Sequence, residues 1–156
     1  QTHEVNMKQL LNFFVLCAFF LLTGCLSDKH VGKIFPQKIF ESVNAKYPSE
    51  KSTLIFIDAP EGYIAPYQAV WEVEKDVDAG DVTAIISSLA LKSSTVIIAG
   101  EDDMLTNATL SKALTKGIDK INGSKAIIVG NKDNQKNLAD LASASGVTLE
   151  FIDNPN

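Results

Sequence analysis

Acidic side chains follow each of the apolar segments that the sequence predicts to be buried strands. In chain order they are Asp58, Glu61, Glu101, Asp102, Asp103, Asp133 and Asp153. If the strands run parallel, their carboxyl ends meet at one edge of the sheet, where open α/β folds bind ligands near a topological switch point. Carboxylate oxygens are the ligands that hard divalent cations prefer. These seven residues, the acidic rim, are therefore a candidate metal or ligand site.

A plainer interpretation of the acidic rim is that strands end in polar residues because loops are solvated. We favour this interpretation, because no distinctive motif surrounds any member of the rim. We therefore expect no metal site and no cofactor, and a divalent cation held by the rim is the alternative.

The residues that would normally accompany such carboxylates in catalysis are missing from the predicted domain. His3, Cys17, Cys25 and His30 all precede it, and every basic residue of the chain is lysine. No phosphate-binding glycine loop and no Gly-x-Ser-x-Gly turn occurs in the sequence. The formal net charge of −5, without any arginine, argues against binding to nucleic acid or to anionic lipid headgroups. We expect a protein that is not an enzyme.

The segment that begins at Met7 has the layout of a secretory signal. Lys8 supplies one positive charge, and an apolar stretch follows from Leu10 to Leu22, ahead of small residues and Cys25. A helix that spans a bilayer needs about 20 apolar residues, so a permanent transmembrane anchor is the weaker interpretation.

Leu22-Thr23-Gly24-Cys25 resembles the lipobox of bacterial lipoproteins, and all four positions match. The resemblance implies cleavage between Gly24 and Cys25, diacylglycerol on the Cys25 sulfur and acylation of the new amino terminus. Several acyl chains hold a protein on a membrane far more firmly than one. Leu26-Ser27 departs from the aspartate typical of inner-membrane retention, which implies the periplasmic face of the outer membrane. The alternative is an ordinary cleaved signal with a chance cysteine.

The expected domain organisation follows from this segment. Residues 1–6 are an upstream extension, 7–24 the signal peptide, 25–35 the lipidated cysteine with a short tether, and 36–156 a single periplasmic domain. The ten tether residues Leu26 to Phe35 extend to at most ~35 Å, so the domain is expected to stay close to its membrane.

Apolar periodicity within residues 36–156 predicts alternating helices and strands. Helices are expected from Pro36 to Tyr47, from an N-cap at Asp81, from an N-cap at Thr106 or Asn107, and from an N-cap at Asn134. Strands are expected at 52–58, 95–99, 126–129 and 147–152, and 67–77 favours a half-exposed strand over a helix. Consecutive helix–strand units predict an α/β fold, one three-layer domain with a mostly parallel sheet of about four to five strands and helices on both faces.

These observations favour a lipid-anchored outer-membrane lipoprotein. Its domain is expected to be a non-catalytic binding or structural component of an envelope assembly of the secretion, pilus or conjugation type. The expected partners are the membrane, through the acyl chains, and an envelope protein. The alternative is a small metal-binding domain, ligand-binding domain or enzyme that uses the acidic rim.

Overall fold

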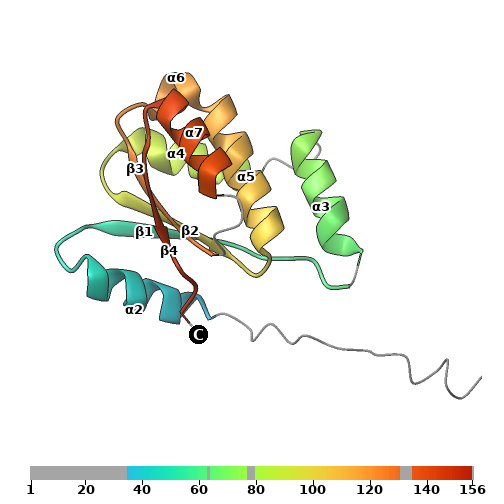
Figure 1. Ribbon diagram of the computed structural model, residues 1–156, viewed down its shortest axis with the longest axis horizontal. Helices are drawn as coiled ribbons and strands as arrows, with labels where there is room; N and C mark the ends of the chain where they lie inside the picture. The colour runs from blue at the N-terminus through green and yellow to red at the C-terminus, as the bar shows by residue number, and fades with distance from the viewer. Residues whose placement is uncertain (1–34, 63, 77–79, 131–134, 156) are drawn as a thin grey trace, which may run out of the picture. The chain divides into compact units, whose positions relative to one another are not determined.

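Four parallel strands form one sheet in the order β1-β2-β3-β4. The computed structural model describes residues 35–62, 64–76, 80–130 and 135–155, which all belong to one compact unit (Figure 1). The strands are β1 (Ser52–Ile57), β2 (Thr95–Gly100), β3 (Lys125–Val129) and β4 (Thr148–Ile152). The predicted α/β class and its parallel sheet are confirmed.

The two central strands carry the core. Every residue of β2 is buried, and so are the last four residues of β3, whereas β1 and β4 at the edges are mostly half-buried. The register places Ile98 between Ile55 and Ile128, so β-branched side chains stack across the sheet. Continuous apolar runs are typical of strands covered on both faces.

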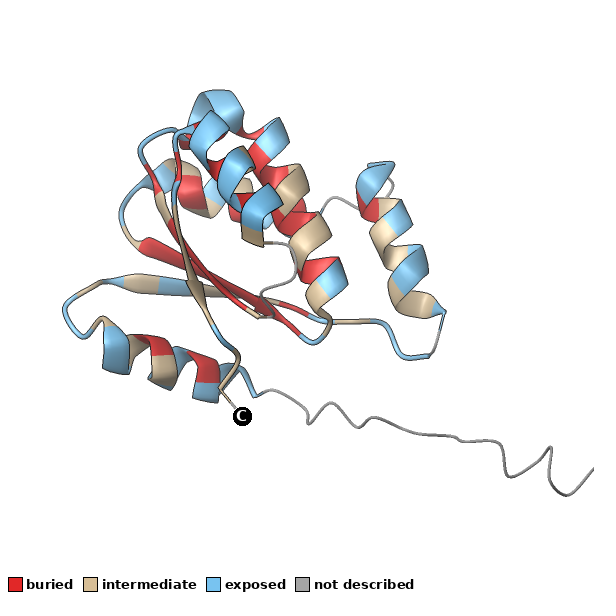
Figure 2. Cartoon of the chain, in the orientation of Figure 1, coloured by how far each residue is buried: buried red, intermediate tan, exposed pale blue. Residues whose placement is uncertain are grey.

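The helices divide unequally between the two faces of the sheet. Helix α2 (Pro36–Lys46) contributes Ile39 and Val43 to a small core on one face. The other face is covered by α4 (Gly80–Leu91), α5 (Asp103–Lys116), α6 (Ile118–Ile121) and α7 (Gln135–Ser145) (Figures 1 and 2). Right-handed crossovers that always step in the same direction put their helices on the same face. Helix α2 precedes β1 and makes no crossover, so it is left to cover the opposite face.

The strand order also corrects the expectation of a topological switch point. Among the strands that the structure describes, the order never reverses. A ligand crevice formed where two crossovers diverge is therefore not part of this sheet. Any pocket at the carboxyl edge must instead be built by helices and loops.

The predicted strand at 67–77 is wrong. Residues Ala65–Glu74 form helix α3, and its first turn contains Pro66, a position that suits proline. The strand was expected because apolar and acidic residues alternate from Trp71 to Val77 in the sequence, which would turn Trp71 inward with Val73. In the structure Trp71 is 54% exposed. The buried side of α3 instead carries Val73, with Ala69 and Val70 packed beside it.

Helix α5 begins earlier than its sequence pattern indicates. Its N-cap is Asp102, whose side chain accepts a hydrogen bond from the Leu105 amide, rather than Thr106 or Asn107. Helix α5 ends at Gly117, and α6 follows as a separate helical turn. A β-carbon at Gly117 would lie 2.9 Å from the carbonyl oxygen of Ala113 and 3.1 Å from Ile86, so this close approach requires glycine.

Within the part of the chain that the structure describes, no helix is both long and apolar enough to cross a membrane.

Candidate functional site

The structure brings the described members of the acidic rim to one edge of the sheet, but several of them have structural roles there. Glu101 Oε2 accepts a hydrogen bond from the Ala59 amide at 3.2 Å, which links the ends of β1 and β2. Asp102 Oδ1 accepts from the Leu105 amide at 2.8 Å and caps α5. Asp103 lies so close to Gly130 that a β-carbon there would be 2.8 Å from its Oδ1.

The other described rim residues lie at the surface. Asp58 and Glu61 are exposed in the segment after β1, and Asp153 is exposed after β4. Asp133 lies outside the described residues, as do Gly24 and Cys25. Within residues 35–62, 64–76, 80–130 and 135–155, no group of three or more His, Cys, Asp or Glu side chains is placed to hold a metal ion.

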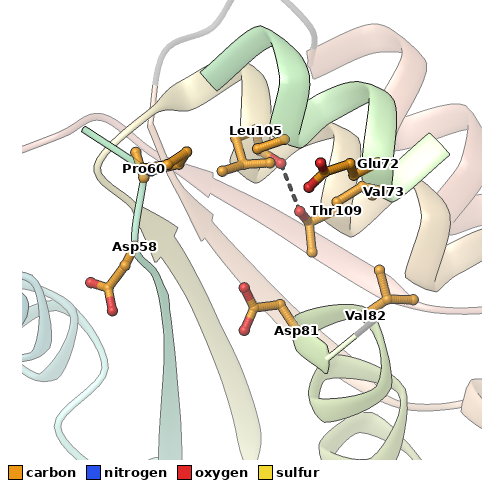
Figure 3. A pocket seen from close by; sticks show the side chains of 10 residues that line it. Asp58, Pro60, Glu72, Val73, Asp81, Val82, Leu105 and Thr109 are labelled. Atoms are coloured by element: carbon orange, nitrogen blue, oxygen red, sulfur yellow. Dashed lines mark hydrogen bonds between the residues drawn. The ribbon is translucent and has the colours of Figure 1, made fainter. Parts of the chain in front are cut away.

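A pocket of about 370 Å³ opens beside the carboxyl end of β1. Three carboxylates line it: Asp58 after β1, Glu72 on α3 and Asp81 in the first turn of α4. Figure 3 shows Glu72 and Asp81 reaching toward the same space, whereas the Asp58 carboxylate points away from its centre in this view. We call this cavity the acidic pocket.

The floor of the acidic pocket is apolar. Val73, Val82 and Leu105 form much of it, and all three are buried (Figure 3). The one hydroxyl in the floor, that of Thr109, donates to the Leu105 carbonyl oxygen at 2.8 Å and is satisfied within α5. A carboxylate mouth above a hydrocarbon floor suits a cation carried on an apolar stem.

The charged side chains among the described residues that line this pocket are carboxylates. Glu72 Oε1 accepts a hydrogen bond from the neutral Gln68 amide at 3.0 Å, and no lysine is among the residues that line the pocket. A positively charged group that enters the pocket would therefore meet carboxylates. Hydrogen bonds between ionised partners are roughly twice as strong as neutral ones.

The sequence identified only part of this pocket. Asp58 was a rim residue because it ends a predicted strand. Asp81 was expected as an N-cap, but α4 begins at Gly80, so Asp81 lies inside the first turn. Glu72 was missed, because a strand at 67–77 would not have placed it beside the end of β1. The signal that would have revealed it is the proline at Pro66 followed by helical spacing of Ala69 and Val73.

A second polar cluster lies at the opposite, amino-terminal edge of the sheet. Lys125 Nζ is 2.6 Å from Glu50 Oε1 and 3.1 Å from Glu150 Oε1. Tyr47 donates a hydrogen bond to Glu150, and Thr95 donates one to Glu50 at 2.6 Å. Lys125 also lies 5.1 Å from the centre of the Tyr47 ring. This cluster, the Lys125 network, holds the end of α2 and the following turn against β2, β3 and β4.

The pKa shifts in the Lys125 network follow its hydrogen bonds. The hydrogen bond to Lys125 lowers the pKa of Glu50, and the same contact raises the pKa of Lys125. The hydrogen bond from Tyr47 lowers the pKa of Glu150 and raises the pKa of the Tyr47 hydroxyl. Each charge has a partner within the network, so we assign it a structural role.

Comparison of this chain with protein-family models, with curated proteins and with solved structures finds no match.

Proposed function

We propose that this chain is a lipid-anchored, non-catalytic binding module of the bacterial envelope, and that its acidic pocket receives a cationic group from an envelope protein. The observation that supports this proposal best is the placement of Glu72 and Asp81 around one cavity above an apolar floor. The two residues come from different helices, so the fold itself, and not a single local motif, brings them together.

A lysine or arginine side chain fits this pocket chemically. Such side chains bury their methylene stems against apolar surface while the charged head stays near water or a counter-charge. Val73 and Val82 offer the apolar surface, and Glu72 and Asp81 offer the counter-charges. A charge pair of this kind contributes more to specificity and association rate than to affinity.

The anchor half of the proposal rests on the lipobox resemblance at Leu22–Cys25. In this proposal the acyl chains on Cys25 hold the protein on the periplasmic face of the outer membrane. The tether ends at Phe35, directly before α2. Because the tether extends to at most ~35 Å, partners of the pocket would be proteins that work close to that membrane.

The proposal is tested by neutralising the pocket in the full chain. We expect chemical crosslinking in the bacterial envelope to capture a specific protein with the wild type. The Glu72→Gln/Asp81→Asn variant should lose most of that product. Glu41→Gln/Asp119→Asn is the matched control, since it removes two exposed carboxylates elsewhere and keeps the same net charge as the pocket variant.

Equal capture by the wild type and the pocket variant would refute a role for the pocket. Mass spectrometry of the same samples shows whether Cys25 carries lipid, so the anchor is assessed separately from the pocket.

A further inference from the structure

Helix α3 has a second apolar face that nothing in the described chain covers. Ile64, Tyr67 and Trp71 are 73%, 59% and 54% exposed. Their spacing of three and then four residues places them on one side of the helix, away from the buried Val73. We call these three residues the α3 stripe.

The stripe is not needed to hold α3 in place. Helix α3 packs mainly against α5, outside the layers over the sheet (Figure 1). Just beyond its carboxyl end, Asp76 pairs with Lys112 at 3.3 Å and with Lys116 at 2.9 Å. Lys112 also donates to the Glu74 carbonyl oxygen at 2.9 Å. The helix is thus fixed by its inner face and its end, and the stripe stays available on a rigid support.

The composition and spacing of the stripe fit a helical protein partner. Single exposed apolar residues are ordinary, but tryptophan and tyrosine side by side are the residue types that dominate binding energy at interfaces. Alternating steps of three and four residues form the seam by which one helix packs along another. The two turns from Ile64 to Trp71 therefore present half of such a seam.

The charges around the stripe indicate which kind of helix fits. On the helix, Glu72 and Glu74 flank the stripe on its two sides, and Lys75 continues it at the carboxyl end. Because glutamate outnumbers lysine along this part of α3, complementary charge favours a partner with an apolar seam and basic residues on its flanks.

We propose that the α3 stripe docks a basic amphipathic helix of a protein partner, with Trp71 as its main anchor. This inference deepens the proposed function, because Glu72 belongs both to the flank of the stripe and to the acidic pocket. A lysine or arginine on the flank of the docked helix pairs with Glu72, while the apolar residues of that helix cover the stripe.

Trp71 is the only tryptophan in the chain, so its fluorescence reports directly on the stripe. The test uses the full lipidated protein in phosphatidylcholine nanodiscs. The probe is a designed helix of about 18 residues, roughly 27 Å long, with leucines on one face and lysines beside them. A control helix of the same design carries glutamate in place of each lysine. We expect the lysine helix to shift Trp71 emission to shorter wavelength and to saturate, and the glutamate helix to leave it unchanged.

Two variants separate the stripe from the pocket. Tyr67→Ser should weaken binding of the lysine helix by about tenfold or more, as expected at a hot spot. Ile118→Ser, which changes an exposed apolar residue on α6, should not. The pocket variant Glu72→Gln/Asp81→Asn should weaken binding but keep the Trp71 shift at saturation. If the pocket variant lost all binding while Tyr67→Ser bound normally, the stripe would not be the docking site for the helix. If the pocket variant bound normally while Tyr67→Ser was defective, only the role of the pocket in this binding would be refuted.

The same sample detects other occupants of the stripe. Quenching of Trp71 by brominated lipid before any helix is added would mean that the membrane covers it. A shift that depends on protein concentration would mean that a second copy does. Either result, or equal binding of the lysine and glutamate helices, would overturn the proposal.

Discussion

Replacing Gly100 by alanine tests how the carboxyl edge of the sheet is built. Gly100 ends β2 at the point where α5 begins, and a β-carbon there would collide with the hydroxyl of Thr106 and lie 2.8 Å from the Ile57 carbonyl oxygen. Thr106 is buried and donates to the Asp102 carbonyl oxygen at 2.7 Å, so it cannot move aside freely. Overpacking costs about 1–3 kcal/mol, and disturbing one buried hydrogen bond costs about 1 kcal/mol more.

We therefore expect Gly100→Ala to lower the free energy of unfolding by about 2–4 kcal/mol, or the Tm by roughly 10 °C. Urea unfolding followed by circular dichroism measures it. The second variant, Thr106→Ala, removes the colliding hydroxyl and provides a double-mutant cycle. The loss in Gly100→Ala/Thr106→Ala should be smaller than the sum of the two single losses. Strictly additive losses, or a stable Gly100→Ala protein, would show that the contact between β2 and α5 is not as tight as described.

Three further predictions concern the anchor, the helix cap and the Lys125 network. Cys25→Ala should abolish labelling of the protein by a palmitate analogue in cells, and label that persists would refute lipidation at this residue. Asp102→Ala should cost about 1 kcal/mol of stability in urea unfolding through loss of the α5 cap, whereas Asp102→Asn should cost little, because asparagine caps equally well. Since its folded pKa is lowered, Glu150 stabilises the fold above its unfolded value, and this contribution is lost as the pH falls through the folded pKa. Glu150→Gln should therefore flatten the decline in stability between neutral and acidic pH, and an unchanged pH profile would contradict the network.

The strands and the first helix could be predicted because their signals are local. Pro36 starts α2 as expected, and the β-branched run at 95–99 lies in the wholly buried β2. Gly146 follows α7, the helix expected after Asn134, and has a φ of +69°, a conformation that glycine adopts most easily. In each case a few adjacent residues decide the outcome, and tertiary contacts do not override them.

The acidic pocket could be predicted only in part, because it depends on tertiary contacts. Asp58 was identified from its place at the end of an apolar run. Glu72 could be assigned to the pocket only once α3 was known to be a helix. The alternation of apolar and acidic residues around Trp71 had favoured a strand there instead. The side of α3 that turns inward is decided by packing against α5, which no local pattern encodes. The absence of a switch point likewise follows from the strand order, which the sequence pattern does not predict.

Binding of a cationic side chain in the acidic pocket can be measured by mapping amide chemical shifts in solution. The probe is Nα-acetyl-lysine methylamide, and its Nε-acetylated form, which lacks the charge, is the control. We expect the charged probe alone to shift the amides near Glu72, Val73, Asp81 and Val82, and Glu72→Gln/Asp81→Asn to remove these shifts. Shifts spread evenly over the acidic surface, or identical shifts with the uncharged probe, would contradict it.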